Sequence, residues 1–113
     1  MVILPFPFVA RKGIRLKARP ALILSDHSID RRFDDIILAG ITSQRISDIK
    51  PTEYLVSEEN DGFKKTGLAK SSVVRCEYVM TIPSRLIARK IGILPENFLK
   101  EVDGRLKISL GLP

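Results

Sequence analysis

Runs of apolar residues, separated by short polar segments, make up most of the chain. From Asp35 to Gln44 apolar residues occupy both faces of an expected strand until Thr42-Ser43-Gln44, where polar residues replace them. Ser72 to Ile82 alternates more strictly, which is typical of a half-buried strand. We predict strands at Val2 to Val9, Pro20 to Ser25, Asp35 to Gln44, Thr52 to Val56, Ser72 to Ile82 and Ala88 to Leu94.

Polar segments connect these strands. Pro5 and Pro7, two residues apart, lack their N–H groups on the same side, so the first strand is expected to be an edge or bulged strand. Ala10 to Ala18 is predicted to be a loop, because its closely spaced cations repel one another and offer little to bury. Turn-forming residues predict further connections at Asp26 to Asp35 and Ser57 to Gly67, and Pro83 to Ile87 predicts one helical turn.

The hydrophobic period changes to that of a helix after Pro95. One apolar stripe contains Leu99, Val102, Leu106 and Leu110, and Gly111 is a suitable helix stop. The chain is therefore expected to form one domain over residues 1–113, of mainly β class: a small, mostly antiparallel barrel closed by a C-terminal helix.

Charge is concentrated near the N-terminus. Of the 19 Lys and Arg residues, the five at positions 11, 12, 15, 17 and 19 lie in residues 1–20, which contain no acid, and the other 14 are balanced by 13 acids. A local basic patch favours a polyanionic partner, and nucleic acid before a membrane. The candidate cations for this contact are Arg11, Lys12, Arg15 and Lys17.

Several kinds of site are absent from the sequence. Cys76 is the only cysteine, which excludes an internal disulfide and favours a reducing cytoplasm. One His and one Cys do not make a zinc site, and we expect no metal and no cofactor. The apolar start of the chain is too short to span a bilayer, so no membrane association is expected.

Arg19 and Thr42 are the strongest candidate catalytic residues. Arg19 stands where the basic segment meets an apolar strand, and a guanidinium fixed there suits a phosphate group. Thr42 lies at the polar end of the next expected strand. If the two strands are antiparallel neighbours, the start of one and the end of the other lie at the same rim. This arrangement would bring Arg19 and Thr42 together.

Ordered motifs give the chain a resemblance to a known family. They are Pro5-Phe6-Pro7-Phe8, Lys17-Ala18-Arg19-Pro20-Ala21-Leu22-Ile23-Leu24-Ser25-Asp26, Ile41-Thr42-Ser43-Gln44, Gly67-Leu68 with Ser72-Val73-Val74-Arg75, and Lys90-Ile91-Gly92 with the terminal helix. In this order and spacing the chain resembles the MazF/PemK toxin endoribonucleases. The resemblance implies a homodimer of SH3-like barrels of the CcdB/PemK type, and a toxin with a cognate antitoxin that cuts single-stranded RNA without a metal.

The resemblance also implies roles for individual residues. The Arg of the family's Arg-Pro pair and the Thr of its Ile-Thr-x-Gln segment map onto Arg19 and Thr42 as the catalytic residues. The implied reaction is attack of a ribose 2′-OH on the adjacent phosphorus. Arg19 stays protonated, which suits a phosphate clamp and a candidate proton donor to the leaving oxygen rather than a base. Thr42 and Gln44 would orient the reacting groups, Ser43 and Gln44 are expected to contact RNA, and no conventional base is evident.

Two departures from the family pattern carry structural expectations. Family members usually have a few residues ending in Gly-Asp ahead of the first strand, whereas this chain starts at Met1-Val2-Ile3, so a poorly anchored first strand is expected. Gly40 replaces a bulkier residue and is expected to loosen the strand that carries Thr42.

Other interpretations remain open. His27 has a side chain suited to base catalysis but sits in a polar turn, and Cys76 is expected to be an inert buried thiol. The alternative functions are a barrel that binds nucleic acid or an antitoxin without cutting, and a topoisomerase poison of the CcdB kind.

Overall fold

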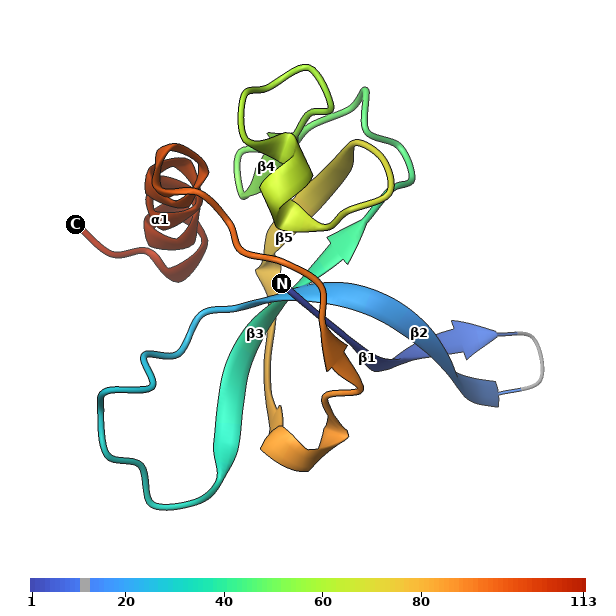
Figure 1. Cartoon of the computed structure of the whole chain (residues 1–113), viewed down its shortest axis with the longest axis vertical. Helices are drawn as coiled ribbons and strands as arrows, with labels where there is room; N and C mark the ends of the chain where they lie inside the picture. The colour runs from blue at the N-terminus through green and yellow to red at the C-terminus, as the bar shows by residue number, and fades with distance from the viewer. Residues whose placement is uncertain (11–12) are drawn as a thin grey trace.

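A computed structural model describes residues 1–10 and 13–113, with side chains described at residues 1–2 and 18–113. Figure 1 shows a twisted sheet, a long β-hairpin extending from it, and a C-terminal helix packed on one side. The strands are β1 (Val2–Ala10), β2 (Gly13–Ile23), β3 (Asp35–Thr42), β4 (Glu53–Val56), β5 (Ser72–Pro83) and β6 (Arg89–Lys90), and the helix is α1 (Glu96–Leu110).

The predicted mainly β architecture with a C-terminal helix is confirmed, but the sheet does not close into a barrel. The six strands lie in the order β4-β5-β3-β2-β1-β6, and neighbouring strands in this order are antiparallel. Among the described residues, no strand pairing joins the edge strands β4 and β6. Strand β6 has only two residues and pairs with Val2 and Ile3, so it is too short to bridge the gap.

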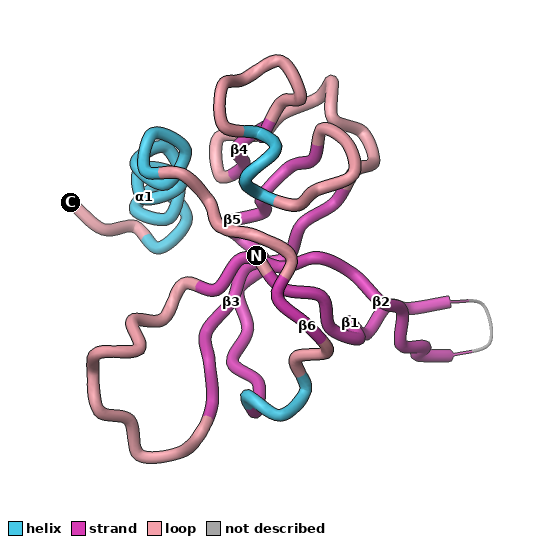
Figure 2. The backbone as a smooth tube through the Cα atoms, in the orientation of Figure 1, coloured by secondary structure: helices cyan, strands magenta, loops and turns pink. Residues whose placement is uncertain are grey.

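The predicted loop at Ala10 to Ala18 is wrong. Strands β1 and β2 pair continuously from Val2↔Ala21 to Ala10↔Gly13 and form the hairpin that extends from the body in Figures 1 and 2. Ile14 and Leu16 alternate with Arg15 and Lys17 in the sequence, a period-2 signal that the charge density obscured. Pro5 and Pro7 lie in the part of β1 for which no partner strand other than β2 is described, as an edge position requires.

Helix α1 packs on β4 and β5, and its buried stripe differs from the predicted one. Phe98 and Val102 are buried, and Leu106 packs against the same core, at an i, i+4, i+8 spacing. The predicted core residues Leu99 and Leu110 are 39% and 60% exposed. The helix faces the sheet with Phe98, whose ring centroid lies 6.4 Å from that of Tyr54. The helical period of the sequence does not determine which side of the helix faces the sheet.

The first strand is well anchored, contrary to the expectation from its short start. The Met1 side chain is buried in the main core, and the Met1 ammonium donates a hydrogen bond to the Gly92 carbonyl at 3.1 Å. The Ile91 N–H donates to the Met1 carbonyl at 3.0 Å. Burial lowers the pKa of this ammonium, and the nearby Lys90 charge lowers it further.

The apolar side chains form two core clusters. The cluster on the helix side includes Leu22, Ala39, Val74 and Phe98, and the smaller one includes Ala21, Leu38 and Ile82. Within the described part of the chain, no helix is long and apolar enough to cross a membrane.

Gly104 in the helix has open space around it, whereas Gly92 in a loop is tightly packed, and this difference gives a stability prediction. Gly104 lies inside α1, and a Cβ added there would have no atom within 4 Å. We expect Gly104→Ala to raise the free energy of unfolding by about 1 kcal/mol, because Ala restricts the unfolded chain and favours the helix. Urea denaturation at fixed protein concentration measures the change.

Gly92→Ala is the contrasting variant. A Cβ at Gly92 would lie 2.4 Å from the Lys65 and Thr66 backbone. We expect a loss of about 2 kcal/mol, because backbone atoms of two packed segments must separate. A Gly104→Ala protein that is less stable than the parent would contradict the helix assignment at this position.

Candidate functional site

The face of the sheet that carries the candidate residues is defined by strand register. Ala21 of β2 pairs with Gly40 of β3, and Gly40 pairs on its other side with Arg75 of β5. Directly paired residues of antiparallel strands point to the same face. The described β2–β3 pairing ends at Ala21↔Gly40, two residues before Arg19 and Thr42. That Arg19 and Thr42 lie together therefore stays a prediction.

Strand β5 has a bulge beside this face. The pairing steps from Ala39↔Val79 to Gly40↔Arg75, so three residues of β5 lie between two successive residues of β3. Bulges redirect side chains and are frequent next to functional sites. The Tyr78 ring in this bulge lies 3.5 Å from the position of a Cβ on Gly40, so the ring fills the space beside the glycine in the strand that carries Thr42.

A groove of about 410 Å³ lies along the ends of β3, β4 and β5. Its described lining contains Thr42, Gln44, Arg45, Asp48, Lys50, Glu53, Val73, Arg75 and Glu77. Thr42 pairs with Val73, which places its side chain two residues from Arg75 on the same face. The groove thus combines a hydroxyl, an amide, three cations and three carboxylates.

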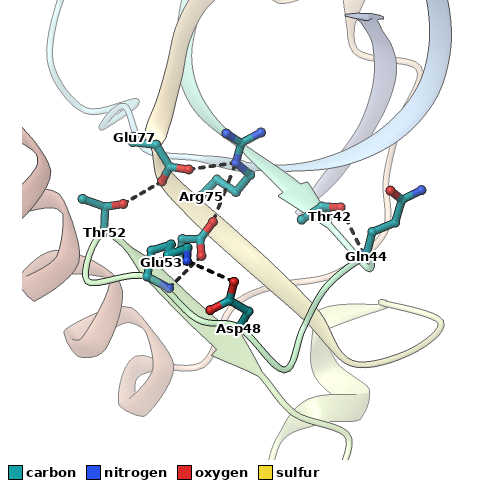
Figure 3. A network of polar contacts seen from close by, with 8 residues as sticks. Thr42, Gln44, Asp48, Thr52, Glu53, Arg75 and Glu77 are labelled. Carbon is teal, nitrogen blue, oxygen red and sulfur yellow. Dashed lines mark hydrogen bonds and ion pairs between the residues drawn. The ribbon is translucent and has the colours of Figure 1, made fainter.

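Arg75 is the centre of a polar network in this groove (Figure 3). Its Nε donates a hydrogen bond to Glu77 Oε1 at 2.8 Å and lies 3.9 Å from Glu53 Oε2. Its guanidinium also lies over the Tyr78 ring, 5.2 Å from the centroid. Among the described residues the terminal nitrogens of Arg75 have no hydrogen-bond partner, so they are available to an anionic ligand.

Glu77 is held at both oxygens. Besides the bond from Arg75, Oε2 accepts a hydrogen bond from Thr52 Oγ1 at 3.0 Å. Burial raises the pKa of Glu77, but hydrogen bonds from Arg75, the Glu77 backbone amide and Thr52, together with the Arg75 charge, outweigh burial and leave the pKa below its ordinary value. The carboxylate is therefore ionised at neutral pH and fixed in orientation.

Thr42 has one hydrogen bond that defines its role. Its Oγ1 accepts from the Gln44 N–H at 3.1 Å, as Figure 3 shows. Because the hydroxyl acts as an acceptor in that bond, its hydrogen remains available to donate to a ligand. Gln44 is exposed at the groove, and Ser43 is half-buried and is not among the described lining residues.

The remaining sequence candidates lie elsewhere or beyond the described side chains. Arg19 is half-buried on β2 and is not among the described lining residues of the groove. Arg15 and Lys17 are in β2, but their side chains are not among those described, and Arg11 and Lys12 fall outside the described residues.

His27 and Cys76 lie apart from the groove. His27 lines a different hollow of about 550 Å³ in the connection between β2 and β3, together with Arg32 and Phe33. Cys76 is buried, as expected, and burial raises its thiol pKa to about 11. Within the described residues no group of His, Cys, Asp and Glu side chains could hold a metal ion.

Of the groove residues that the sequence did not single out as a site, Arg75, Glu77 and Arg45 are the three with a proposed role. Arg75 and Glu77 alternate with apolar residues of β5, which made them look like solvent-facing positions of a half-buried strand. The available signal was that Arg75 ends the family motif Ser72-Val73-Val74-Arg75 and that Glu77, of opposite charge, stands two residues later.

Known proteins share both the sequence pattern and the fold. Residues 2–110 match the family described as PemK-like, MazF-like toxin of type II toxin–antitoxin systems. Mycobacterium tuberculosis toxin MazF-mt6 is 25% identical with a TM-score of 0.73, covering 100% of this chain and 99% of that one.

Two more distant structures share the fold. A mycobacterial endoribonuclease solved with its cognate antitoxin is 18% identical with a TM-score of 0.70, covering 99% and 93% of the two chains. The MazE–MazF complex of Deinococcus radiodurans contains a match at 21% identity and a TM-score of 0.66, with coverage of 99% and 93%.

The Thr52 hydrogen bond gives a testable pKa prediction. We expect Thr52→Val to raise the pKa of Glu77 towards its ordinary value, because one donor to the carboxylate is lost. Carboxyl NMR titration of Glu77 measures this change.

In the Thr52→Val variant the free energy of unfolding should depend less on pH in the acid range. Glu77 has a lowered pKa in the folded protein, so its contribution is fully present above the unfolded value of about 4.3 and disappears as pH falls through the folded value. Thr81→Val, an exposed position on β5, is the matched control and should leave the Glu77 titration unchanged. An unshifted Glu77 titration in Thr52→Val would show that the hydrogen bond contributes nothing.

Proposed function

The chain belongs to the PemK-like, MazF-like toxins of type II toxin–antitoxin systems, and on that premise we propose that it is a metal-independent endoribonuclease that cuts single-stranded RNA. The observation that carries this proposal is the groove in which Thr42, Arg75 and Glu77 lie together. The fold shared with a mycobacterial endoribonuclease supports it.

The proposed reaction uses the substrate's own nucleophile. The ribose 2′ oxygen attacks the adjacent phosphorus, the bond from phosphorus to the 5′ oxygen breaks, and the products carry a 2′,3′-cyclic phosphate and a 5′-hydroxyl. The 2′-OH loses one proton, for which Glu77 is the candidate acceptor, and the leaving 5′ oxygen gains one proton, for which Arg19 is the candidate donor. DNA lacks the 2′-OH, so the proposal restricts the substrate to RNA.

Arg19 and Arg75 supply positive charge to the phosphorane. The transition state carries more negative charge on the phosphoryl oxygens than the ground state, so fixed cations stabilise it preferentially. Arg75 is fixed by Glu77, Glu53 and the Tyr78 ring, while its terminal nitrogens stay available. The backbone of Arg19 is fixed in β2, because Arg19 pairs with Leu4 of β1.

Thr42 is suited to bind a phosphoryl oxygen, and Glu77 is suited to accept the proton of the 2′-OH. The Thr42 hydroxyl can donate to a phosphoryl oxygen while it accepts from the Gln44 N–H. Glu77 is the ionised carboxylate that shares the groove with Thr42 and already contacts Arg75, so it is our candidate acceptor for the 2′-OH proton.

RNA binding would extend beyond the reacting phosphate. Gln44 lies at the groove, and we infer that Ser43, Arg11, Lys12, Arg15 and Lys17 also contact the RNA strand. Arg15 and Lys17 belong to β2, Arg11 and Lys12 precede β2 in the sequence, and closely spaced cations suit a single-stranded backbone.

The assembly and its location follow from the same premise. We infer that the chain forms a homodimer, is neutralised by a cognate antitoxin and acts in the cytoplasm, where messenger RNA is available. Similar folds solved with an antitoxin or as MazE–MazF support the partner. Large exposed apolar side chains offer surfaces for association, among them Leu86, Ile93, Ile108 and Leu110.

Cleavage in EDTA tests the function and the site. The parent protein should convert single-stranded RNA to fragments with cyclic-phosphate ends. Arg19→Ala, Arg75→Ala and Thr42→Ala should each reduce the rate by about 100-fold or more, because each removes a group that acts on the transition state. Glu77→Gln should lose most of the activity, since the amide cannot accept the proton.

Arg32→Ala is the matched control, since Arg32 lies in the connection between β2 and β3 beside the other hollow. Circular dichroism of every variant verifies the fold. Intact RNA with the parent protein would overturn the proposed activity. Cleavage at the parental rate by Arg19→Ala or Thr42→Ala would overturn that residue's assignment.

Light scattering tests the assembly. The purified protein should have twice the mass of the 12.7 kDa chain, and the mass should rise when the product of a small acidic reading frame next to its gene is added. A monomer that remains active on RNA would contradict the dimer.

A further inference from the structure

Arg45 is in a backbone conformation that arginine rarely adopts. Its φ is 52°, and it is the non-glycine residue with positive φ in the described part of the chain. The left-handed region brings Cβ close to the following carbonyl, so glycine and asparagine are the residues that usually occupy it. Strain of this kind is typical of functional sites.

Two local turns hold Arg45 in this conformation. On one side, the Gln44 N–H bonds to Thr42 Oγ1 at 3.1 Å, and on the other, the Asp48 N–H donates to the Arg45 carbonyl at 3.3 Å. Neither turn uses the Arg45 side chain. Glycine or asparagine would satisfy the same backbone, so the turns alone give no reason for an arginine.

The Arg45 guanidinium differs from the other cations of the groove. Lys50 Nζ is paired with Asp48 Oδ2 at 3.0 Å, and Arg75 is paired with Glu77 and Glu53. Among the described residues the Arg45 guanidinium has no carboxylate or hydrogen-bond partner, although its side chain lines the same groove as Thr42 and Gln44. It is therefore the groove cation that forms no ion pair with the described carboxylates, and all of its donors are available to an anion.

From these three observations we propose that Arg45 binds an RNA phosphate next to the one that reacts at Thr42. The strained backbone is retained because it presents the guanidinium to the groove, where its planar donors fit two phosphoryl oxygens. This inference rests on the proposed function, and it assigns Arg45 to substrate binding rather than to the chemical step.

Binding of 2′-O-methyl RNA tests the proposal, because this probe lacks the nucleophile and cannot be cut. A random-sequence single-stranded pool makes the measurement independent of the preferred cleavage site. We expect Arg45→Asn to weaken binding about 10-fold and to reduce the slope of log Kd against log salt by about 0.7, the value for one phosphate contact on a single strand. In cleavage assays the same variant should raise KM with little change in kcat.

Stability separates a binding role from a structural one. Arg45→Asn should raise the melting temperature, because asparagine tolerates the left-handed conformation better than arginine does. Arg45→Lys should keep the salt slope of the parent, because the charge remains, but should recover only part of the affinity, because lysine lacks the planar pair of donors. Arg32→Asn is the matched control and should change neither binding nor KM.

The outcomes distinguish this proposal from the proposed function. Parental affinity and salt slope in Arg45→Asn would overturn the role of Arg45, even if the protein cuts RNA. A lower melting temperature in Arg45→Asn would overturn the strain argument. A parent that binds the pool but cuts no RNA would overturn the endoribonuclease activity and leave the Arg45 measurement valid.

Discussion

The pairing of β3 on both of its edges is the constraint on which the candidate site depends. Gly40 faces Ala21 on one side and Arg75 on the other, so one short strand fixes which residues of β2 and β5 share a face with Thr42. A slip of one residue would move Thr42 to the opposite face, because side chains alternate along a strand. The buried residues Leu38 and Ala39, which point into different core clusters, oppose such a slip. Core packing on both faces of the sheet thus determines the geometry of a polar groove at its end.

Arg75 and Glu77 in the groove are paired with side chains that lie far away in the sequence. Arg75 and Glu77 come from β5, while Thr52 and Glu53 come from the start of β4, and the Cys76 N–H donates to the Thr52 carbonyl at 3.0 Å. The backbone bond holds the β4 segment against the bulge of β5, and the side-chain bonds then orient the Arg75 guanidinium. Exposed ion pairs contribute little stability, so the consequence of this network is the orientation of charge rather than a more stable fold.

Stability and function make opposite demands on the segment between β3 and β4. This segment leaves the sheet immediately after Thr42, where two turns direct the chain along the groove. The left-handed Arg45 in it is less stable than a glycine or asparagine would be, yet it adds an unpaired cation beside the hydroxyl. Natural proteins often retain such local strain where a ligand binds, because the rest of the core supplies the stability.

The sequence by itself determined the elements whose patterns are local and the family to which the chain belongs. The alternation along β5, the helical period after Pro95 and the polar end of β3 follow from neighbouring residues, and the ordered motifs around Arg19 and Thr42 indicated the function. Only the tertiary structure decided that the basic segment from Gly13 to Ala18 is a strand, that the sheet stays open, and that α1 buries Phe98 instead of Leu99. It also decided that Arg75, Glu77 and Arg45 line a groove with Thr42. These features depend on strand pairing, helix docking and turn geometry between residues far apart in the chain, and periodicity along the sequence carries no information about such contacts.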